Sequence, residues 1–203
     1  MSAKQFAPAC ERNRDYILAV LQKILTGARS VLEIGSGTGQ HAAYFAPRLP
    51  HLRWQPTDLG SNLDSIRAWR EESGAPNLLA PRELDLSRSP WPVERVDAVV
   101  CINTIHIVAW PRVEALFAGA ARVLPPGGVL YAYGPYRYAD RPLEPSNREF
   151  DRWLKSRDPA SGIRDFEAVD ALARDNGLHL AGDEAMPANN RSLWWEKGDN
   201  FKC

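Results

Sequence analysis

The feature that most constrains this chain is a glycine-rich turn between two segments of different character. Residues 33–43 read EIGSGTGQHAA, and they begin inside a short apolar run at 30–34 and end inside a segment at 40–46 with helical composition. A short apolar run bounded by turn residues is typical of a strand. Glycines at alternate positions allow a loop backbone to approach a ligand closely; they are Gly35, Gly37 and Gly39. The local prediction is strand, loop, helix.

The same alternation continues along the chain. Strands are predicted at 52–56, 78–84, 96–102 and 129–133, with helices at 61–73 and 113–124. Residues 96–102 are almost wholly apolar, which indicates a strand covered on both faces. Strands that alternate with helices form a parallel sheet with right-handed crossovers, the doubly wound architecture.

The two ends and one interruption complete the prediction. Apolar residues recur at helical spacing before Gly27, and they predict an N-terminal helix. Residues 134–165 break the alternation and contain an inserted helix, for which Ser146 to Glu149 form a capping box. A helix that begins at Phe166 precedes two strands, at 178–181 and 192–196. Because only a short loop connects these two strands, they should be antiparallel. We therefore predict one α/β domain over residues 1–203: a Rossmann-like doubly wound sheet of seven strands, mostly parallel, with an antiparallel last strand.

Composition limits the partners. The chain has 25 basic and 25 acidic residues, so it lacks the positive charge of a general nucleic-acid binder. No apolar run approaches the roughly 18 residues of a membrane span. Three cysteines without paired spacing indicate reduced thiols, and four scattered histidines indicate no metal site. We expect a cytoplasmic protein that binds neither nucleic acid nor membrane.

Acidic residues follow the second and third predicted strands, at the edge where a doubly wound sheet binds ligands. Asp58 comes 19 residues after Gly39, and Asp85 ends the third strand. A carboxylate after the second strand can accept both hydrogen bonds of a ribose diol. A dinucleotide is disfavoured, because Gln40 replaces the glycine that its motif requires and because Glu33 would repel a pyrophosphate. A nucleoside with a positive sulfonium, S-adenosylmethionine, fits better.

The segment VLEIGSGTGQ resembles motif I of the class I S-adenosylmethionine-dependent methyltransferases, and Asp58, Asp85 and residues 101–103 fall where the next three motifs are expected. The chain is most similar to the domain of unknown function 938 family, with which it shares CERNRDYIL, GSGTGQHA, CINTIHI, GPYRY, PSNREFD, GIRDFEAV and MPANN at similar intervals. The resemblance implies the fold predicted above, S-adenosylmethionine as the cofactor and S-adenosylhomocysteine as the product.

The resemblance also implies roles for residues around the loop. Glu33 would order the loop or bind the amino group of the cofactor, Asp58 would hold the ribose, and Asp85 with Leu86 would flank the adenine. For each carboxylate the structural alternative is a helix cap or a solvated loop residue. The implied cofactor-binding residues are Glu33, Gly35, Ser36, Gly37, Gly39, Asp58, Leu59, Asp85, Leu86 and Asn103.

Candidate catalytic residues follow the fourth and fifth strands. His106 lies just past the most buried strand and could accept a proton from the nucleophile; the alternative is that it only hydrogen-bonds or packs the loop. Tyr136 could border the sulfonium and Arg137 could bind a substrate carboxylate; the alternative for Tyr136 is that it fills the core. The predicted substrate-binding residues are Asn13, His106, Tyr136, Arg137, Asn189 and Asn190.

These features predict methyl transfer to a small molecule by in-line displacement. Residues 1–27 and 134–165 would form a lid that excludes water. The alternatives are a nicotinamide-dependent oxidoreductase, a catalytically idle module that binds S-adenosylmethionine or a partner subunit, and a methyltransferase that acts on protein or transfer RNA. The sequence specifies neither the methyl acceptor nor the oligomeric state.

Overall fold

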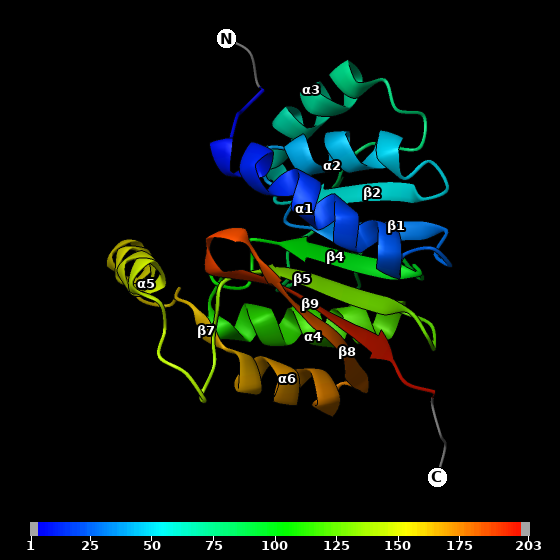
Figure 1. The fold of residues 1–203 in the computed structure, drawn as a ribbon. Helices are drawn as coiled ribbons and strands as arrows, with labels where there is room; N and C mark the ends of the chain where they lie inside the picture. The colour runs from blue at the N-terminus through cyan, green and yellow to red at the C-terminus, as the bar shows by residue number, and fades with distance from the viewer. Residues whose placement is uncertain (1–3, 200–203) are drawn as a thin grey trace.

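A seven-stranded sheet organises the molecule. The computed structural model describes residues 4–199, and the strand order is β3-β2-β1-β4-β5-β9-β8 (Figure 1). The strands are β1 (Ser30–Ile34), β2 (Arg53–Asp58), β3 (Arg82–Glu83), β4 (Ala98–Ile102), β5 (Val129–Gly134), β8 (Leu178–Met186) and β9 (Asn190–Lys197). Pairings from β3 through β5 are parallel, and β9 is antiparallel to both β5 and β8. The predicted fold class is confirmed.

Helices cover both faces of the sheet and one of its ends. They are α1 (Pro8–Ile24), α2 (Gln40–Phe45), α3 (Leu63–Ser73), α4 (Trp110–Val123), α5 (Pro145–Arg157) and α6 (Phe166–Asp175). α1 and α2 pack on one face, whereas α4 and α6 pack on the other. α5 lies beyond the carboxyl ends of β4 and β5, toward which their arrows point (Figure 1). It is therefore on the side of the loops that follow these strands.

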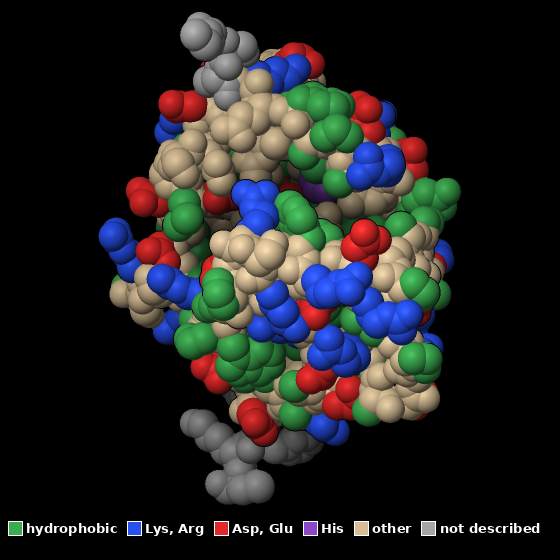
Figure 2. All heavy atoms as spheres, turned by 90° about the vertical axis from the view of Figure 1, so that its left-hand side faces the viewer, with side chains coloured by type: hydrophobic (Ala, Val, Ile, Leu, Met, Phe, Trp, Pro, Cys, Tyr) green, Lys and Arg blue, Asp and Glu red, His purple; other side chains and the backbone are tan. Residues whose placement is uncertain are grey.

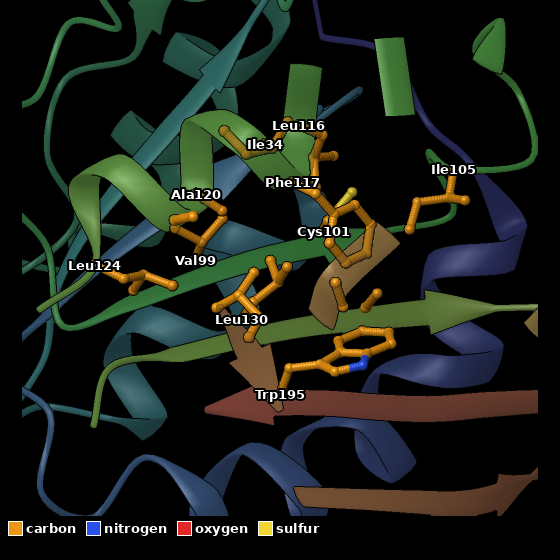
Figure 3. Packing of buried hydrophobic residues seen from close by; sticks show 14 of the residues in the cluster. Ile34, Val99, Cys101, Ile105, Leu116, Phe117, Ala120, Leu124, Leu130 and Trp195 are labelled. Carbon is orange, nitrogen blue, oxygen red and sulfur yellow. The ribbon is translucent and has the colours of Figure 1, made fainter. Parts of the chain in front are cut away.

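Alternating side chains of the central strands form two cores. Leu32, Val99 and Leu130 belong to the cluster under α4 and α6, which Trp195 of β9 completes (Figure 3). Their chain neighbours, such as Val100 of β4, belong to the cluster under α1 and α2. Strands buried on both faces need apolar residues at nearly every position, which explains the apolar run at β4.

Three local predictions were wrong. β3 is only two residues long, because Leu78 forms no more than an isolated bridge with Trp54 and Pro81 has no N–H to donate. α5 has Glu144 as its N-cap and no side-chain capping bond, so the predicted capping box does not form; Ser146 lies inside the first turn and accepts from Asn189 instead. β8 continues to Met186 rather than ending at residue 181.

A small addition was not predicted. β6 (Tyr136–Arg137) pairs in parallel with β7 (Arg164–Asp165), which ties the start of the 134–165 segment to its end. α5 is therefore the helix of a closed insertion. No helix within residues 4–199 has the length and apolar character to cross a membrane.

Candidate active site

The glycine loop at the end of β1 is held by close backbone contacts. Gly35 has φ +68° and Gly39 has φ +94°, and a Cβ added at Gly39 would lie 2.8 Å from the Cα of Ile66 in α3. Gly37 also has positive φ, but a Cβ added there would meet nothing within 4 Å. Gly35 and Gly39 thus serve the packing of the loop, whereas Gly37 leaves bare backbone facing open space, which fits a ligand that lies against it.

Asp58 joins the end of β2 to this loop. Its Oδ2 accepts from the backbone N–H of Gly37 at 2.6 Å, and its Oδ1 accepts from the N–H of Leu59 at 2.7 Å and from the side chain of Asn62 at 2.9 Å. These three donors fix the carboxylate beside the open position over Gly37. Leu59, the next residue, is 50% exposed. Its side chain offers an apolar surface on which a nucleoside could pack.

Glu33 lies beneath the loop. Its side chain is 2% exposed, and its Oε2 accepts from the indole N–H of Trp54 and the hydroxyl of Ser36, each at 3.0 Å. Burial raises the pKa of Glu33 to about 7; the hydrogen bonds from Trp54 and Ser36 oppose this rise, and the nearby charge of Asp58 adds slightly to it. Of the two roles predicted for Glu33, the geometry supports ordering of the loop, because the carboxyl oxygen is already bonded inside the protein.

The N-terminal segment docks on α2 through polar contacts. The side-chain oxygen of Gln40 accepts from the backbone N–H of Ala7 at 2.5 Å, and Asn13 of α1 bonds His41 of α2 at 2.8 Å. The ring of His41 stacks on Phe45 with the centroids 5.3 Å apart. Gln40, which departs from the dinucleotide pattern, thus holds the start of α1 next to the glycine loop.

A cavity of about 1160 Å³ opens between α1 and α5, over the ends of β4 and β5. Figure 2 shows this face, which is hollowed near its centre. Its lining includes the predicted residues Asn13, Asn103, His106 and Asn190, together with Ala9, Arg12, Tyr16, Ile107, Tyr133, Pro135, Ser146, Asn147, Phe150, Trp153, Leu154, Arg157, Asp158, Ser161, Pro187 and Ala188. A concave, mostly apolar site with a few polar groups is typical of small-molecule binding.

His106 lies at the inner end of this cavity. It is 4% exposed, and its ring meets that of Phe150 edge-on with centroids 5.6 Å apart. Burial, with a smaller effect from the charge of Arg164, lowers the pKa of His106 to about 4. A Cβ on Gly134 would be 3.1 Å from its Nδ1, so glycine there makes room for the ring. The imidazole is therefore neutral near pH 7 and has a lone pair to accept a proton.

Other predicted residues lie outside the cavity lining. Tyr136 is 4% exposed in the core under α4, and its hydroxyl has no hydrogen-bond partner among the described residues. Arg137 pairs with Asp165 at 3.2 Å and with Asp151 of α5 at 3.6 Å. Asn189 donates to Ser146 at the start of α5. These positions support structural roles and give no support to substrate contact.

Asp85 and Leu86 also lie away from the cavity. Asp85 accepts from the N–H and hydroxyl of Ser87 and from Arg112 at 2.7 Å, contacts that lower the pKa of its carboxyl. Leu86 packs against the core under α4. If Asp85 and Leu86 flank the adenine as predicted, the adenine lies outside this cavity, at the part of the sheet edge between Asp58 and β3.

The sequence analysis missed most of the cavity walls. Phe150, Trp153 and Arg157 come from one face of α5, and Arg12 and Tyr16 from one face of α1. The sequence predicted the two helices but not which of their side chains border an opening. The structure supplies that signal, because Trp153 and Tyr16 are 49% and 53% exposed, and large aromatic side chains gathered around an opening often mark a binding site.

The pKa of Glu33 leads to a pH-dependent prediction. A carboxyl whose pKa rises from 4.5 to about 7 on folding stabilises the protein below pH 4.5, and that contribution is lost as the pH rises to 7. Glu33→Gln removes this loss, so its free energy of unfolding relative to the wild type should improve by up to about 3 kcal/mol between pH 4.5 and 8. Urea unfolding across this range measures it.

The exposed Glu94→Gln is the control, because it makes the same carboxyl-to-amide change at the surface. A difference between Glu33→Gln and the wild type that stays constant with pH would mean that the buried carboxyl is ionised throughout this range.

Comparison with known proteins agrees with the fold. An O-methyltransferase family protein from Burkholderia thailandensis superposes with a TM-score of 0.78 at 18% identity, over 92% of this chain and 59% of that one. Human N-acetylserotonin methyltransferase in complex with S-adenosylmethionine superposes with a TM-score of 0.71 at 15% identity, over 98% and 60%. Likeness at these identities shows a common fold.

In sequence, the chain is 29% identical over 163 residues to aclacinomycin 10-hydroxylase RdmB of Streptomyces purpurascens, which covers 78% of this chain and 42% of that protein. The chain thus spans about two fifths of that relative and about three fifths of the two solved structures. The family model described as "Protein of unknown function (DUF938)" matches residues 4–197, and the chain belongs to this family.

Proposed function

We propose that this protein transfers a methyl group from S-adenosylmethionine to a small molecule. The observation that carries the proposal is the shared edge of the sheet: the open backbone at Gly37, the carboxylate of Asp58 and the neutral His106 all follow parallel strands of one fold. Solved methyltransferases with this fold support it, one of them in complex with S-adenosylmethionine. The cavity between α1 and α5 gives the methyl acceptor a partly covered place beside that edge.

The residues around the loop fit the cofactor. The methionine part would lie against the backbone at Gly37, in the loop that Gly35 helps to shape. Asp58 would accept from the ribose hydroxyls, and Asn103 would face the methyl-bearing end from the exit of β4. Ser36 and Gly39 hold the loop in shape, through Glu33 and through α3. When bound, S-adenosylmethionine supplies an activated methyl carbon and leaves as the neutral thioether. We retain Leu59, Asp85 and Leu86 as the adenine side of this site.

The protein contributes alignment and a proton acceptor. α5 and the end of β5 would hold the acceptor so that its nucleophilic atom is in line with the methyl carbon, and orientation of this kind lowers barriers by several kcal/mol. His106 would take the proton that a hydroxyl, thiol or amine loses as it is methylated. Tyr136 and Arg137 have no part in this step, because their contacts lie in the core and with Asp151 and Asp165.

Two alternatives differ in what the cavity receives. A catalytically idle binding module would hold S-adenosylmethionine without transferring its methyl group. One relative in sequence is named a hydroxylase and not a methyltransferase, so methyl transfer has to be tested directly. A protein or transfer-RNA methyltransferase needs an open surface, whereas α1 and α5 partly roof this cavity. We therefore favour a small acceptor, in the cytoplasm.

Calorimetry with S-adenosylhomocysteine, S-adenosylmethionine and NADH tests the cofactor. We expect the first two to bind and NADH to give no heat of binding. Release of S-adenosylhomocysteine in the presence of a panel of phenols, thiols, amines and carboxylates then separates an enzyme from a binding module. Binding of NADH alone, or no turnover with any acceptor class, would overturn the proposal.

Two substitutions should separate cofactor binding from chemistry. Asp58→Ala removes the ribose acceptor and an anchor of the loop, so the affinity for S-adenosylhomocysteine should fall by about tenfold or more. His106→Ala should leave that affinity within a few-fold and lower the rate at saturating cofactor by about 100-fold. Calorimetry and initial rates measure both.

His51→Ala is the matched control, because this histidine lies away from the cavity and bonds the backbone carbonyl of Leu25, the residue after α1. An unchanged rate in His106→Ala would remove His106 from the role of base.

The lowered pKa of His106 predicts the pH profile. A base with a pKa of about 4 is deprotonated above pH 5, so kcat/KM should stay flat between pH 5.5 and 7.5 for an acceptor that does not titrate in this range. An ordinary histidine would give a fall in rate below about pH 6.5. A limb at that pH, present in the wild type and absent in His106→Gln, would show that the imidazole is more solvated than the structure indicates.

The lid hypothesis predicts protection by the cofactor product. Saturating S-adenosylhomocysteine should slow amide exchange in α1 and α5, because closure over the cavity reduces their local opening. α4 packs on the opposite face of the sheet and serves as the internal reference. Unchanged exchange in both α1 and α5 would leave them as fixed walls.

A further inference from the structure

One wall of the cavity is a row of three rings from the floor to the surface. The rings of His106 and Phe150 are 5.6 Å apart at 67°, and those of Phe150 and Trp153 are 5.7 Å apart at 16°. Exposure increases along the row, from 4% at His106 to 49% at Trp153. Phe150 and Trp153 are stacked, and Trp153 remains half exposed beside the partly buried Phe150, so this wall offers an aromatic surface on which another planar ring system packs favourably.

The other side of the cavity matches this surface. Tyr16 of α1 is 53% exposed and lines the opening. Tyr133 lines it from β5, at the sheet. The volume of about 1160 Å³ exceeds what one ring needs, since pockets for drug-sized ligands measure roughly 300–1,000 Å³. There is room for two fused rings beside the methyl-bearing end of a cofactor.

Positive charge gathers in the lining. Arg157 follows Trp153 by one helical turn, with its guanidinium carbon 4.9 Å from the indole centroid. Arg12 lines the cavity from α1. Both side chains are exposed, and neither has an ion-pair partner within residues 4–199.

The charges that face these two arginines leave the lining net positive. Asp158 is the carboxylate in the lining, and its Oδ1 accepts from the N–H of Ala160 at 2.9 Å. His106 is neutral above pH 5. Two guanidinium groups against one carboxylate favour an anionic ligand, and the planar fork of arginine matches a carboxylate.

We propose that the cavity binds a planar aromatic carboxylate. Its ring lies against Phe150 and Trp153, its carboxylate lies at the mouth near Arg157 and Arg12, and its opposite end reaches toward His106. As a statement about the methyl acceptor this rests on the proposed function, but as a statement about binding it does not need the cofactor. Arg12 and Arg157 thus bind the substrate carboxylate, a role that the sequence had suggested for Arg137.

The test compares three probes by calorimetry without cofactor: 2-naphthoate, its neutral amide 2-naphthamide, and the saturated decahydro-2-naphthoate. We expect 2-naphthoate to bind about tenfold more tightly than either of the other two, because only it has both the charge and the flat ring. Arg157→Gln and Arg12→Gln should each weaken 2-naphthoate several-fold, and the double variant should abolish its advantage over the amide. Affinity for the amide should stay within twofold.

Arg152→Gln is the matched control, since Arg152 is an exposed arginine of α5 outside the cavity lining. Circular dichroism checks that every variant is folded. Equal affinity for acid and amide, arginine variants that behave like the control, or no binding of 2-naphthoate at millimolar concentration would each overturn the inference. Binding of S-adenosylhomocysteine, measured separately, reports on the proposed function, so the two can fail independently.

Discussion

The site depends on the hydrogen bonds that the buried carboxyl of Glu33 accepts. This carboxyl accepts from Trp54 of β2 and from Ser36 of the glycine loop, so it joins two neighbouring strands to the loop that leaves one of them. A buried carboxyl without these partners would be costly. Because the loop is fixed from below, Gly37 can present bare backbone and Asp58 can be held beside it. The geometry of the glycine loop follows from these contacts.

The parallel sheet brings the remaining parts together. β1, β2, β4 and β5 end at the same edge, so the glycine loop, Asp58, Asn103 and Tyr133 lie along one edge although the chain separates them widely. α1 is fixed on one side of this edge by Gln40 and His41. α5 is fixed on the other by the ion pair of Arg137 with Asp151 and by the bond from Asn147 to the backbone of Asn189. The cavity is the space that these two anchored helices leave.

The sequence predicted where strands end better than where the side chains beyond them point. Motif spacing put Asp58, Asn103 and His106 at or just past strand ends, as in the structure, because strand ends and glycine turns have local signatures. The same reasoning misplaced Tyr136 and Arg137, since leaving a strand does not specify which face a side chain takes. It also used the charge of Glu33 to select the ligand, whereas burial raises the pKa of this carboxyl to about 7 and makes it a support of the loop.

The sequence by itself determined the alternation of strands and helices, the glycine loop and the strand-end residues, because each depends on neighbours along the chain. Only the tertiary structure decided that β3 is short, that Tyr136 is in the core, and that Phe150, Trp153, Arg157, Arg12 and Tyr16 enclose one cavity. These depend on how α1 and α5 face each other across the sheet edge. Helical periodicity gives the face of each helix, but the docking contacts of distant residues decide what that face meets.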